Sequence, residues 1–150
     1  MTTGTAHGKT TDEAQIRKLI SDREKAVRTK DVNASVSNQA PDVLLFDVVN
    51  PLQQVGSDAS RRRAEQWFSS FQGPIGYEIR DLSITAGDDV AFSHGLSHVT
   101  ATSKDGGDLD MWWRTTVCFS KVEGKWIVMH EHNSVPFDVE SGKASLGLKP

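Results

Sequence analysis

Two histidines and a glutamate stand side by side near the end of the chain, as His130-Glu131-His132. The sequence pattern of the stretch around them, from Gly124 to Phe137, predicts a β-strand. Imidazole and carboxylate groups at this spacing can hold a metal ion, and a histidine can also transfer protons near neutral pH. The motif therefore leaves three alternatives open, which are a metal site, a catalytic site and a structural role.

A metal site has little support from the surrounding sequence. In cupin barrels a glutamate follows the His-x-His pair by four or five residues, and those positions are Pro136 and Phe137 here. A second metal alternative combines His94 and His98 with a carboxylate. Cys118 is the one cysteine of the chain, which excludes a cysteine-based zinc cluster. We expect no metal and no cofactor.

Motifs of other enzyme classes are missing as well. The sequence contains no G-x-S-x-G elbow, no phosphate-binding Walker loop and no G-x-G-x-x-G dinucleotide motif. The net charge of -3 does not favour a nucleic-acid partner. The basic run Arg61-Arg62-Arg63 is interpreted as the solvated face of a helix.

The chain of 150 residues is long enough for one domain with its own core. No apolar stretch approaches the ~20 residues of a membrane span, and the first residues have no apolar signal core, so we expect a cytoplasmic protein without a membrane partner. Residues 1–11 are expected to form a disordered tail, residues 12–137 the domain and residues 138–150 a C-terminal extension.

Helical signals dominate the first half of the chain. Thr10 and Glu13 form a capping-box pattern that predicts a helix over about 12–29. Asp31 can cap a short helix at 32–39.

A β-rich run at 43–49 precedes a third helix. Ser57 or Asp58 can cap this helix, and Gly73-Pro74 is expected to end it. Its apolar stripe includes Trp67 and Phe71.

Strand signals dominate the second half. Short breaks rich in glycine and aspartate separate long β-like runs, which predicts an antiparallel meander. Helices followed by strands indicate an α+β domain with the helices on one face of a sheet. The predicted strands span 75–86, 90–102, 109–121 and 125–135.

The order of these elements, closed by the ending G-K-W-x-x-x-H-x-H-x-S-x-P, resembles the SnoaL-like proteins of the nuclear transport factor 2-like, or ketosteroid-isomerase-like, superfamily. The likeness covers about residues 12–137. It rests on the capped first helix and on the segments PDVLLFDVVNPLQQVGSDASRRRAEQWFSSF and MWWRTTVCFSKVEGKWIVMHEHNSVPF. The resemblance implies a cone-shaped α+β barrel, in which three N-terminal helices pack on a curved, mostly antiparallel sheet around a pocket.

The resemblance also implies roles for individual residues. The family's general-base aspartate falls on Asp47, and its oxyanion-hole tyrosine falls on Arg23. Its second oxyanion donor falls near Thr115 or Val117, so true ketosteroid isomerisation is not expected. We expect Asp47 to act as general base, His94 or His98 as acid, and Arg23 or Asn133 as stabiliser of an oxyanion.

The same comparison assigns the faces of the strands, with the reservation that one β-bulge would invert a face. It places one set of residues from each of three successive strands inward. These sets are His94, Leu96 and His98, then Trp113, Thr115 and Val117, and finally Ile127, Met129, Glu131 and Asn133. The expected ligand-binding residues are Arg23, Trp67, Phe71, Trp113, Thr115, Met129, Glu131 and Asn133. The outer face, with Trp112, Arg114, Trp126, His130 and His132, is expected to form a homodimer. The competing interpretation is that His94 and His98 are core histidines and that Glu131 pairs with Arg23.

The resulting hypothesis is a small-molecule-binding protein. It would perform cofactor-free acid/base chemistry, of the isomerase, cyclase or lyase type, on a small and largely apolar substrate. The alternative is a non-catalytic ligand-binding or assembly module of the same fold, because a fold does not determine a function.

Overall fold

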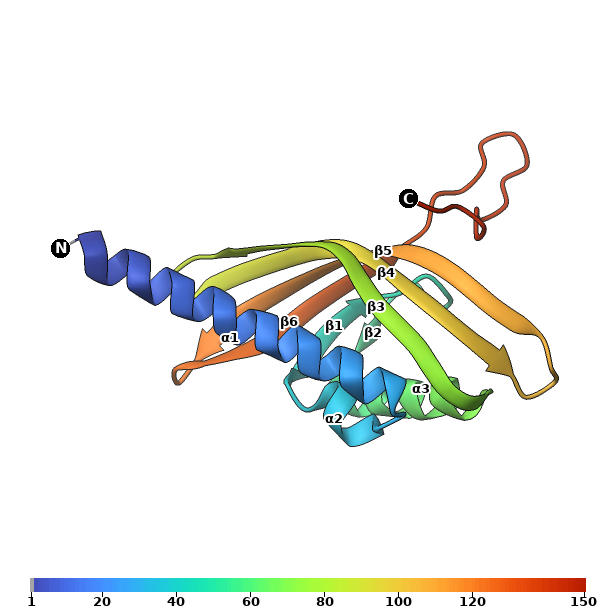
Figure 1. The fold of residues 1–150 in the computed structure, drawn as a ribbon, viewed down its shortest axis with the longest axis horizontal. Coiled ribbons are helices and arrows are strands. Elements are labelled where there is room, and N and C mark those ends of the chain that lie inside the picture. The colour runs from blue at the N-terminus through green and yellow to red at the C-terminus, as the bar shows by residue number, and fades with distance from the viewer. Residues whose placement is uncertain (1) are drawn as a thin grey trace.

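A curved sheet wraps around the helices in a computed structural model of the chain (Figure 1), which describes residues 2–150 and, within the first helix, side chains from Thr11 onward. The elements follow in the order α1 (Thr2–Arg28), α2 (Val32–Val36), β1 (Gln39–Phe46), β2 (Gln54–Val55), α3 (Ser57–Ser69), β3 (Phe71–Ala86), β4 (Val90–Ser103), β5 (Asp108–Val122) and β6 (Lys125–Ser134).

The described strands form one six-stranded sheet in the order β2-β1-β6-β5-β4-β3. β1 and β6 run parallel, and the other neighbouring strands within residues 2–150 run antiparallel. This arrangement confirms the predicted α+β class with a curved, mostly antiparallel sheet. None of the helices described has the length and apolar composition that crossing a membrane requires.

α1 lies along the sheet and contributes one apolar stripe to two core clusters (Figure 1). Ile16 and Ile20 are buried in the first cluster with Trp126, and Val27 is buried in the second. Arg23 lies on the same stripe between them, because residues three and four apart share a face of a helix. The helix therefore directs one charged side chain toward the interior.

α1 is longer than predicted, since it begins at Thr2 rather than near residue 12. The capping pattern at Thr10 and Glu13 lies inside the helix, because threonine and glutamate can also continue a helix at small cost. The division into tail, domain and extension stays a prediction. Asp31 caps α2 as predicted and accepts a hydrogen bond from the Ala34 backbone N–H at 3.1 Å.

The predicted limits of the third helix are wrong at both ends. Gly56, with a φ of +104°, is the N-cap residue of α3, and no side chain within the described chain caps it. Phe71 and the Gly73-Pro74 pair belong to β3, where the register with β4 shifts between Gln72 and Gly76. Glycine and proline mark an irregularity in a strand here, rather than the end of a helix.

The prediction of which β4 side chains point inward is wrong. Its buried inward residues are Ser93, Ser97 and Val99, whereas the sequence predicted that His94 and His98 point inward. Successive side chains of a strand alternate between faces. The two histidines therefore lie on the outer face of the sheet.

Close packing explains why small residues occupy the inner face of β4. A Cβ atom at Gly95 would lie 2.6 Å from Cγ2 of Ile79 on β3. The apolar residues Phe92 and Leu96 lie on the outer side, where Phe92 is 45% exposed. At Gly95 the contact with Ile79 leaves no room for a larger side chain on the inner face.

β6 changes phase at a bulge. Phe119 of β5 pairs with Val128, but the preceding Cys118 pairs with His130. Side chains on β6 therefore change face at this point. Glu131 and Asn133, after the bulge, lie on the inner face as predicted. The predicted phase is wrong for Trp126, which is buried in the core, and for Ile127 and Met129.

Asp12 connects α1 to the sheet through a buried carboxylate. It accepts a hydrogen bond from the Trp126 indole at 3.1 Å and lies 2.9 Å from the Lys121 ammonium group. The hydrogen bond from Lys121 lowers the pKa of Asp12 below its ordinary value of 3.8. A carboxyl group whose pKa is lower in the folded state stabilises the fold above its unfolded pKa, and this contribution disappears as the pH falls through the folded pKa.

Replacing Asp12 with Asn is therefore expected to reduce the free energy of unfolding at pH 7. The difference from the wild-type protein should shrink as the pH falls through the pKa of the carboxyl in the unfolded state and then in the folded state, and it should disappear once the carboxyl is protonated in both states. Urea unfolding of both proteins across a pH series measures this difference. A difference that stays constant down to about pH 2 would show that the Asp12 charge contributes no stability.

Candidate functional site

A cavity of about 670 Å³ opens between the helices and the inner face of the sheet. Cavities of this size are typical of small-molecule sites. Most of its wall is apolar and includes Val27, Leu45, Trp67, Phe68, Val99, Leu109, Met111 and Trp113. Four charged residues line it within the described chain, and they are Arg23, Asp47, Arg63 and Glu131.

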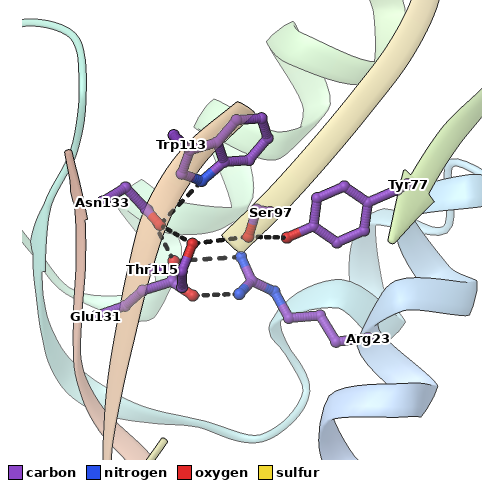
Figure 2. Close-up of polar contacts among 7 residues, drawn as sticks. All are labelled: Arg23, Tyr77, Ser97, Trp113, Thr115, Glu131 and Asn133. Carbon is purple, nitrogen blue, oxygen red and sulfur yellow. Dashed lines mark hydrogen bonds and ion pairs between the residues drawn. The ribbon is translucent and has the colours of Figure 1, made fainter. Parts of the chain in front are cut away.

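Arg23 and Glu131 form an ion pair in the wall of this cavity (Figure 2). Both terminal nitrogens of the guanidinium donate to the carboxylate, one to Oε1 and the other to Oε2 at 3.3 Å. The Glu131 side chain is 6% exposed and that of Arg23 is 37% exposed. The carboxylate raises the pKa of Arg23 above its already high value, so the guanidinium remains charged.

A chain of hydrogen bonds extends from this ion pair along the inner face of the sheet (Figure 2). The Asn133 amide donates to Glu131 at 3.3 Å and accepts from the Trp113 indole at 3.2 Å. Thr115 also donates to the Asn133 oxygen, at 2.9 Å. Because an indole N–H can only donate, it fixes which end of the Asn133 amide faces it.

The network continues from Thr115 to Tyr77. The Ser97 hydroxyl lies 2.7 Å from the Thr115 hydroxyl and 3.4 Å from the Tyr77 hydroxyl (Figure 2). Since Thr115 donates its proton to Asn133, Ser97 must donate to Thr115 and accept from Tyr77. Burial raises the pKa of Tyr77, which keeps it as a neutral donor at the end of the chain.

Asp47 and Arg63 form the second ion pair of the cavity. Asp47 directly follows β1, and its Oδ2 lies 2.8 Å from Nε of Arg63 on α3. The other oxygen accepts a hydrogen bond from the Val48 backbone N–H at 2.7 Å. The side chains of Asp47 and Arg63 are 29% and 24% exposed. This carboxylate is therefore more accessible from the cavity than Glu131.

The two carboxylates differ in their capacity to accept a proton. A carboxylate offers about four lone-pair sites. Three N–H donors, two from Arg23 and one from Asn133, occupy three of the sites of Glu131, whereas two donors, from Arg63 and the Val48 N–H, are described at Asp47. Asp47 thus has the free acceptor sites that a general base requires, and Glu131 holds the network together.

A smaller cavity of about 50 Å³ adjoins the larger one. Five residues line both cavities and form the junction between them, and they are Arg23, Ser35, Gln39, Tyr77 and Glu131. The exposed His94 also borders the smaller cavity. A space of this size admits one or two water-sized groups.

His98 lies away from both cavities, on the outer face of the sheet. Its ring nitrogens lie 3.2 Å from Glu78 and 2.7 Å from Asp110. Its ring stacks on Trp112 with a centroid distance of 4.0 Å. The structure therefore does not bring His98 to the side of Asp47, and the acid role expected for His94 or His98 has no support from the geometry.

The other histidines of β6 also lie on the outer side, as predicted. His130 donates from Nδ1 to the Leu44 carbonyl oxygen at 2.6 Å, and its ring packs against Phe46. His132 is exposed beside Phe46. Among the described residues, no group of three His, Cys, Asp or Glu side chains is placed to hold a metal ion.

Most of the predicted ligand-binding residues do meet at the larger cavity. Phe71 and Met129 are not among the described residues that line either cavity. Phe71 is instead buried in the core, against Trp67. The residues brought together are Arg23, Asp47, Trp67, Trp113, Glu131 and Asn133, with Thr115 in their hydrogen-bond network and in the wall of the smaller cavity.

Sequence reasoning missed Arg63, Gln39, Tyr77 and Ser97. Arg61 and Arg62 are exposed as predicted, but Arg63 turns inward. Arg63 precedes Trp67 by four residues, so the helical stripe that contains Trp67 could have indicated it. Ser97 was assigned to the wrong face with the rest of β4.

The whole domain matches known proteins. The model of the SnoaL-like domain family matches residues 16–138. A structure of a nuclear transport factor 2-like protein of unknown function, from Pseudomonas putida KT2440, is 34% identical to this chain. The match has a TM-score of 0.85 and covers 94% of this chain and 98% of that protein.

Two more distant structures share the fold. A candidate dehydratase of the NTF2-like family from Streptomyces avermitilis is 15% identical, with a TM-score of 0.74 over 84% of this chain and 97% of its own. A candidate aromatic ring hydroxylase from Novosphingobium aromaticivorans is 18% identical, with a TM-score of 0.74 over 83% of this chain and 89% of its own. No curated protein matches the sequence. At 15% and 18% identity, the likeness to these two structures shows the fold alone.

Proposed function

Since the chain belongs to the SnoaL-like domain family, we propose that its larger cavity binds a small, neutral and largely apolar molecule and that Asp47 acts on it as a general base. The single observation that carries the proposal is the composition of the 670 Å³ cavity. Its wall is mainly apolar, and its four charges form two ion pairs. A neutral ligand leaves both pairs intact, whereas a charged ligand would add an unpaired charge to a partly buried site.

The proposed chemistry begins with proton abstraction. Asp47 takes a proton from a carbon atom next to a carbonyl group, and the electron pair moves onto the carbonyl oxygen. The remaining N–H donors of Arg63, beside Asp47, would stabilise that developing charge. Arg23 and Asn133 are held by Glu131, so Arg63 supports this role better than the two residues predicted from the sequence. Return of the proton at another position would complete an isomerisation, and loss of a leaving group would complete an elimination.

A cavity-filling variant tests whether the cavity is the binding site. Ala64 of α3 lines the larger cavity, so Ala64→Trp should occupy the space that the ligand needs. Wild-type protein is expected to retain a neutral compound from a metabolite extract, and mass spectrometry should detect at least tenfold less of it on the variant. Glu65→Trp adds the same side chain to the exposed side of the helix and serves as the control.

Unfolding curves of both tryptophan variants verify that they are folded. If folded Ala64→Trp retains as much of the compound as Glu65→Trp does, the cavity is not the binding site.

The alternative function is a binding module without catalysis. The observation in its favour is that both carboxylates of the cavity already have a cationic partner. This alternative gives the same retention but no chemical change in the retained compound.

We also propose that the protein forms the predicted homodimer through the outer face of its sheet. Trp126 is no longer a candidate interface residue, because it is buried in the core. Trp112, Arg114, His130 and His132 remain the candidate residues, and the mass of the protein in solution is the relevant measurement. The cytoplasmic location likewise stays a prediction.

A further inference from the structure

The segment that follows β6 folds back on itself as a short hairpin, the C-terminal hairpin (residues 135–146). Phe137 pairs with Ala144 in an antiparallel bridge. The backbone N–H of Ser145 donates to the Pro136 carbonyl oxygen at 2.8 Å. These contacts fix the position of the returning chain, although the hairpin stands out from the sheet (Figure 1).

The apolar side chains of the C-terminal hairpin share one face. The register that joins Phe137 to Ala144 places Val135 opposite Leu146, one step further along. Side chains two residues apart in an extended chain point to the same side, so these four apolar side chains lie together. The other face carries Pro136, Asp138, Lys143 and Ser145.

This apolar face borders the larger cavity. Val135, Ala144 and Leu146 all line it. Ala144 and Leu146 lie beyond the match to the SnoaL-like domain family, which ends at residue 138. Part of the cavity wall is therefore supplied by a segment outside that domain.

Much of the same face has no cover within the described chain. Leu146 is 53% exposed and Phe137 is 65% exposed, and neither belongs to the two core clusters. Removing such apolar surface from water is favourable. Because the face is continuous with the cavity wall, a ligand that extends out of the cavity would cover it without any rearrangement of the hairpin.

The apolar rim of the cavity also comes close to the proposed general base. Val49 lines the larger cavity and is 55% exposed. It follows Asp47 by two residues, so the Cα atoms of the two residues lie within about 7 Å of each other. A molecule that reacts at Asp47 can therefore reach the rim with a substituent of moderate length.

We propose that the apolar face of the C-terminal hairpin is a subsite of the larger cavity, and that it binds an alkyl chain of a neutral carbonyl compound whose carbonyl end lies beside Asp47. The inference rests on the proposed function and narrows its substrate class to compounds that carry such a chain. It assigns Leu146 as a specificity-determining residue.

Three neutral ketones with the same carbonyl end and alkyl chains of different length provide the test. They are acetophenone, 4′-butylacetophenone and 4′-octylacetophenone. Calorimetric titration of the wild-type protein is expected to show at least tenfold tighter binding of the butyl compound than of acetophenone, because each buried methylene group contributes about a factor of four. The octyl compound is expected to bind most tightly.

Leu146→Ser removes apolar surface from the subsite. It should weaken the binding of 4′-octylacetophenone about fivefold, as expected for half of a leucine side chain, and leave that of acetophenone unchanged. Val139→Ser is the matched control, because Val139 lies in the same hairpin, is 84% exposed and is not among the described residues that line either cavity. This control should bind all three ketones as the wild-type protein does, and unfolding curves verify that both variants are folded.

Equal binding of 4′-octylacetophenone by the two serine variants would overturn the subsite, and binding of acetophenone to the wild-type protein would still support the proposed function. A lower mass in solution for Leu146→Ser than for Val139→Ser would also overturn the subsite, because it would assign the apolar face to a contact between two copies of the chain. Failure of all three ketones to bind the wild-type protein would contradict both the inference and the neutral ligand of the proposed function.

Discussion

Replacing Arg23 with Met is expected to lower the free energy of unfolding by about 3 kcal/mol at pH 7, because it leaves the Glu131 carboxylate buried without its cationic partner. The Glu131 side chain is 6% exposed, and Asn133 is then its one remaining side-chain donor among the described contacts. A loss of this size is a large part of the stability of an ordinary domain.

Two further variants make this prediction specific. Arg17→Met changes an exposed arginine of the same helix and is expected to alter stability by less than about 0.5 kcal/mol. The double variant Arg23→Met/Glu131→Met removes both charges and should recover most of the loss. Urea unfolding at pH 7 measures all four proteins. If Arg23→Met costs no more than Arg17→Met, the ion pair contributes nothing to the fold.

Replacing Asp47 with Asn is expected to reduce the turnover of the retained compound by about 10²–10⁴-fold, which is the usual contribution of a general base. Asparagine keeps the shape of the side chain and can still accept the hydrogen bond from Arg63. The affinity of the protein for the compound should therefore change little. The relevant measurements are kcat and the dissociation constant of the same compound for both proteins.

Asp42→Asn provides the matched control, because Asp42 is an exposed residue of β1, the strand that Asp47 directly follows. It is expected to leave kcat unchanged. An Asp47→Asn protein with the turnover of the control would assign the base role to another group.

The fold could be predicted from the sequence to a large extent. The four long strands and the capped short helix have strong local signals, and the resemblance of the final hairpin implied the cone-shaped arrangement. The errors lie where tertiary packing overrides local signals. Gly73-Pro74 has the composition of a helix stop, but its backbone fits an irregular strand, and the start of α1 is not set by Thr10 and Glu13.

The candidate site was predicted only in part, because the sequence did not determine which side chains of β4 and β6 face inward. On β4 Ile79 lies so close to Gly95 that no side chain fits there, and the buried residues beside it are Ser93 and Ser97, whereas the comparison with the family placed His94, Leu96 and His98 inward. On β6 a bulge changes the phase just before Glu131. Glu131 and Asn133 were therefore placed correctly, while His94, His98 and Met129 were not.

Arg63 illustrates a different limit of sequence reasoning. Three consecutive arginines suggest a solvated surface, and two of them are exposed. The third lies near Asp47 because β1 ends beside α3, which is a contact between segments 16 residues apart in the chain. Pairing across such a distance depends on how the helix packs on the sheet, which local patterns do not contain.

Solvent hydrogen exchange at carbon tests the central proposal most directly. The compound retained by the protein is incubated with it in D₂O and analysed by mass spectrometry. Proton abstraction by Asp47 predicts that the wild-type protein introduces deuterium at a carbon position, and that Asp47→Asn binds the compound but introduces at least a hundredfold less. Recovery of unlabelled compound from the wild-type protein, or equal labelling by Asp47→Asn, would contradict proton abstraction by Asp47.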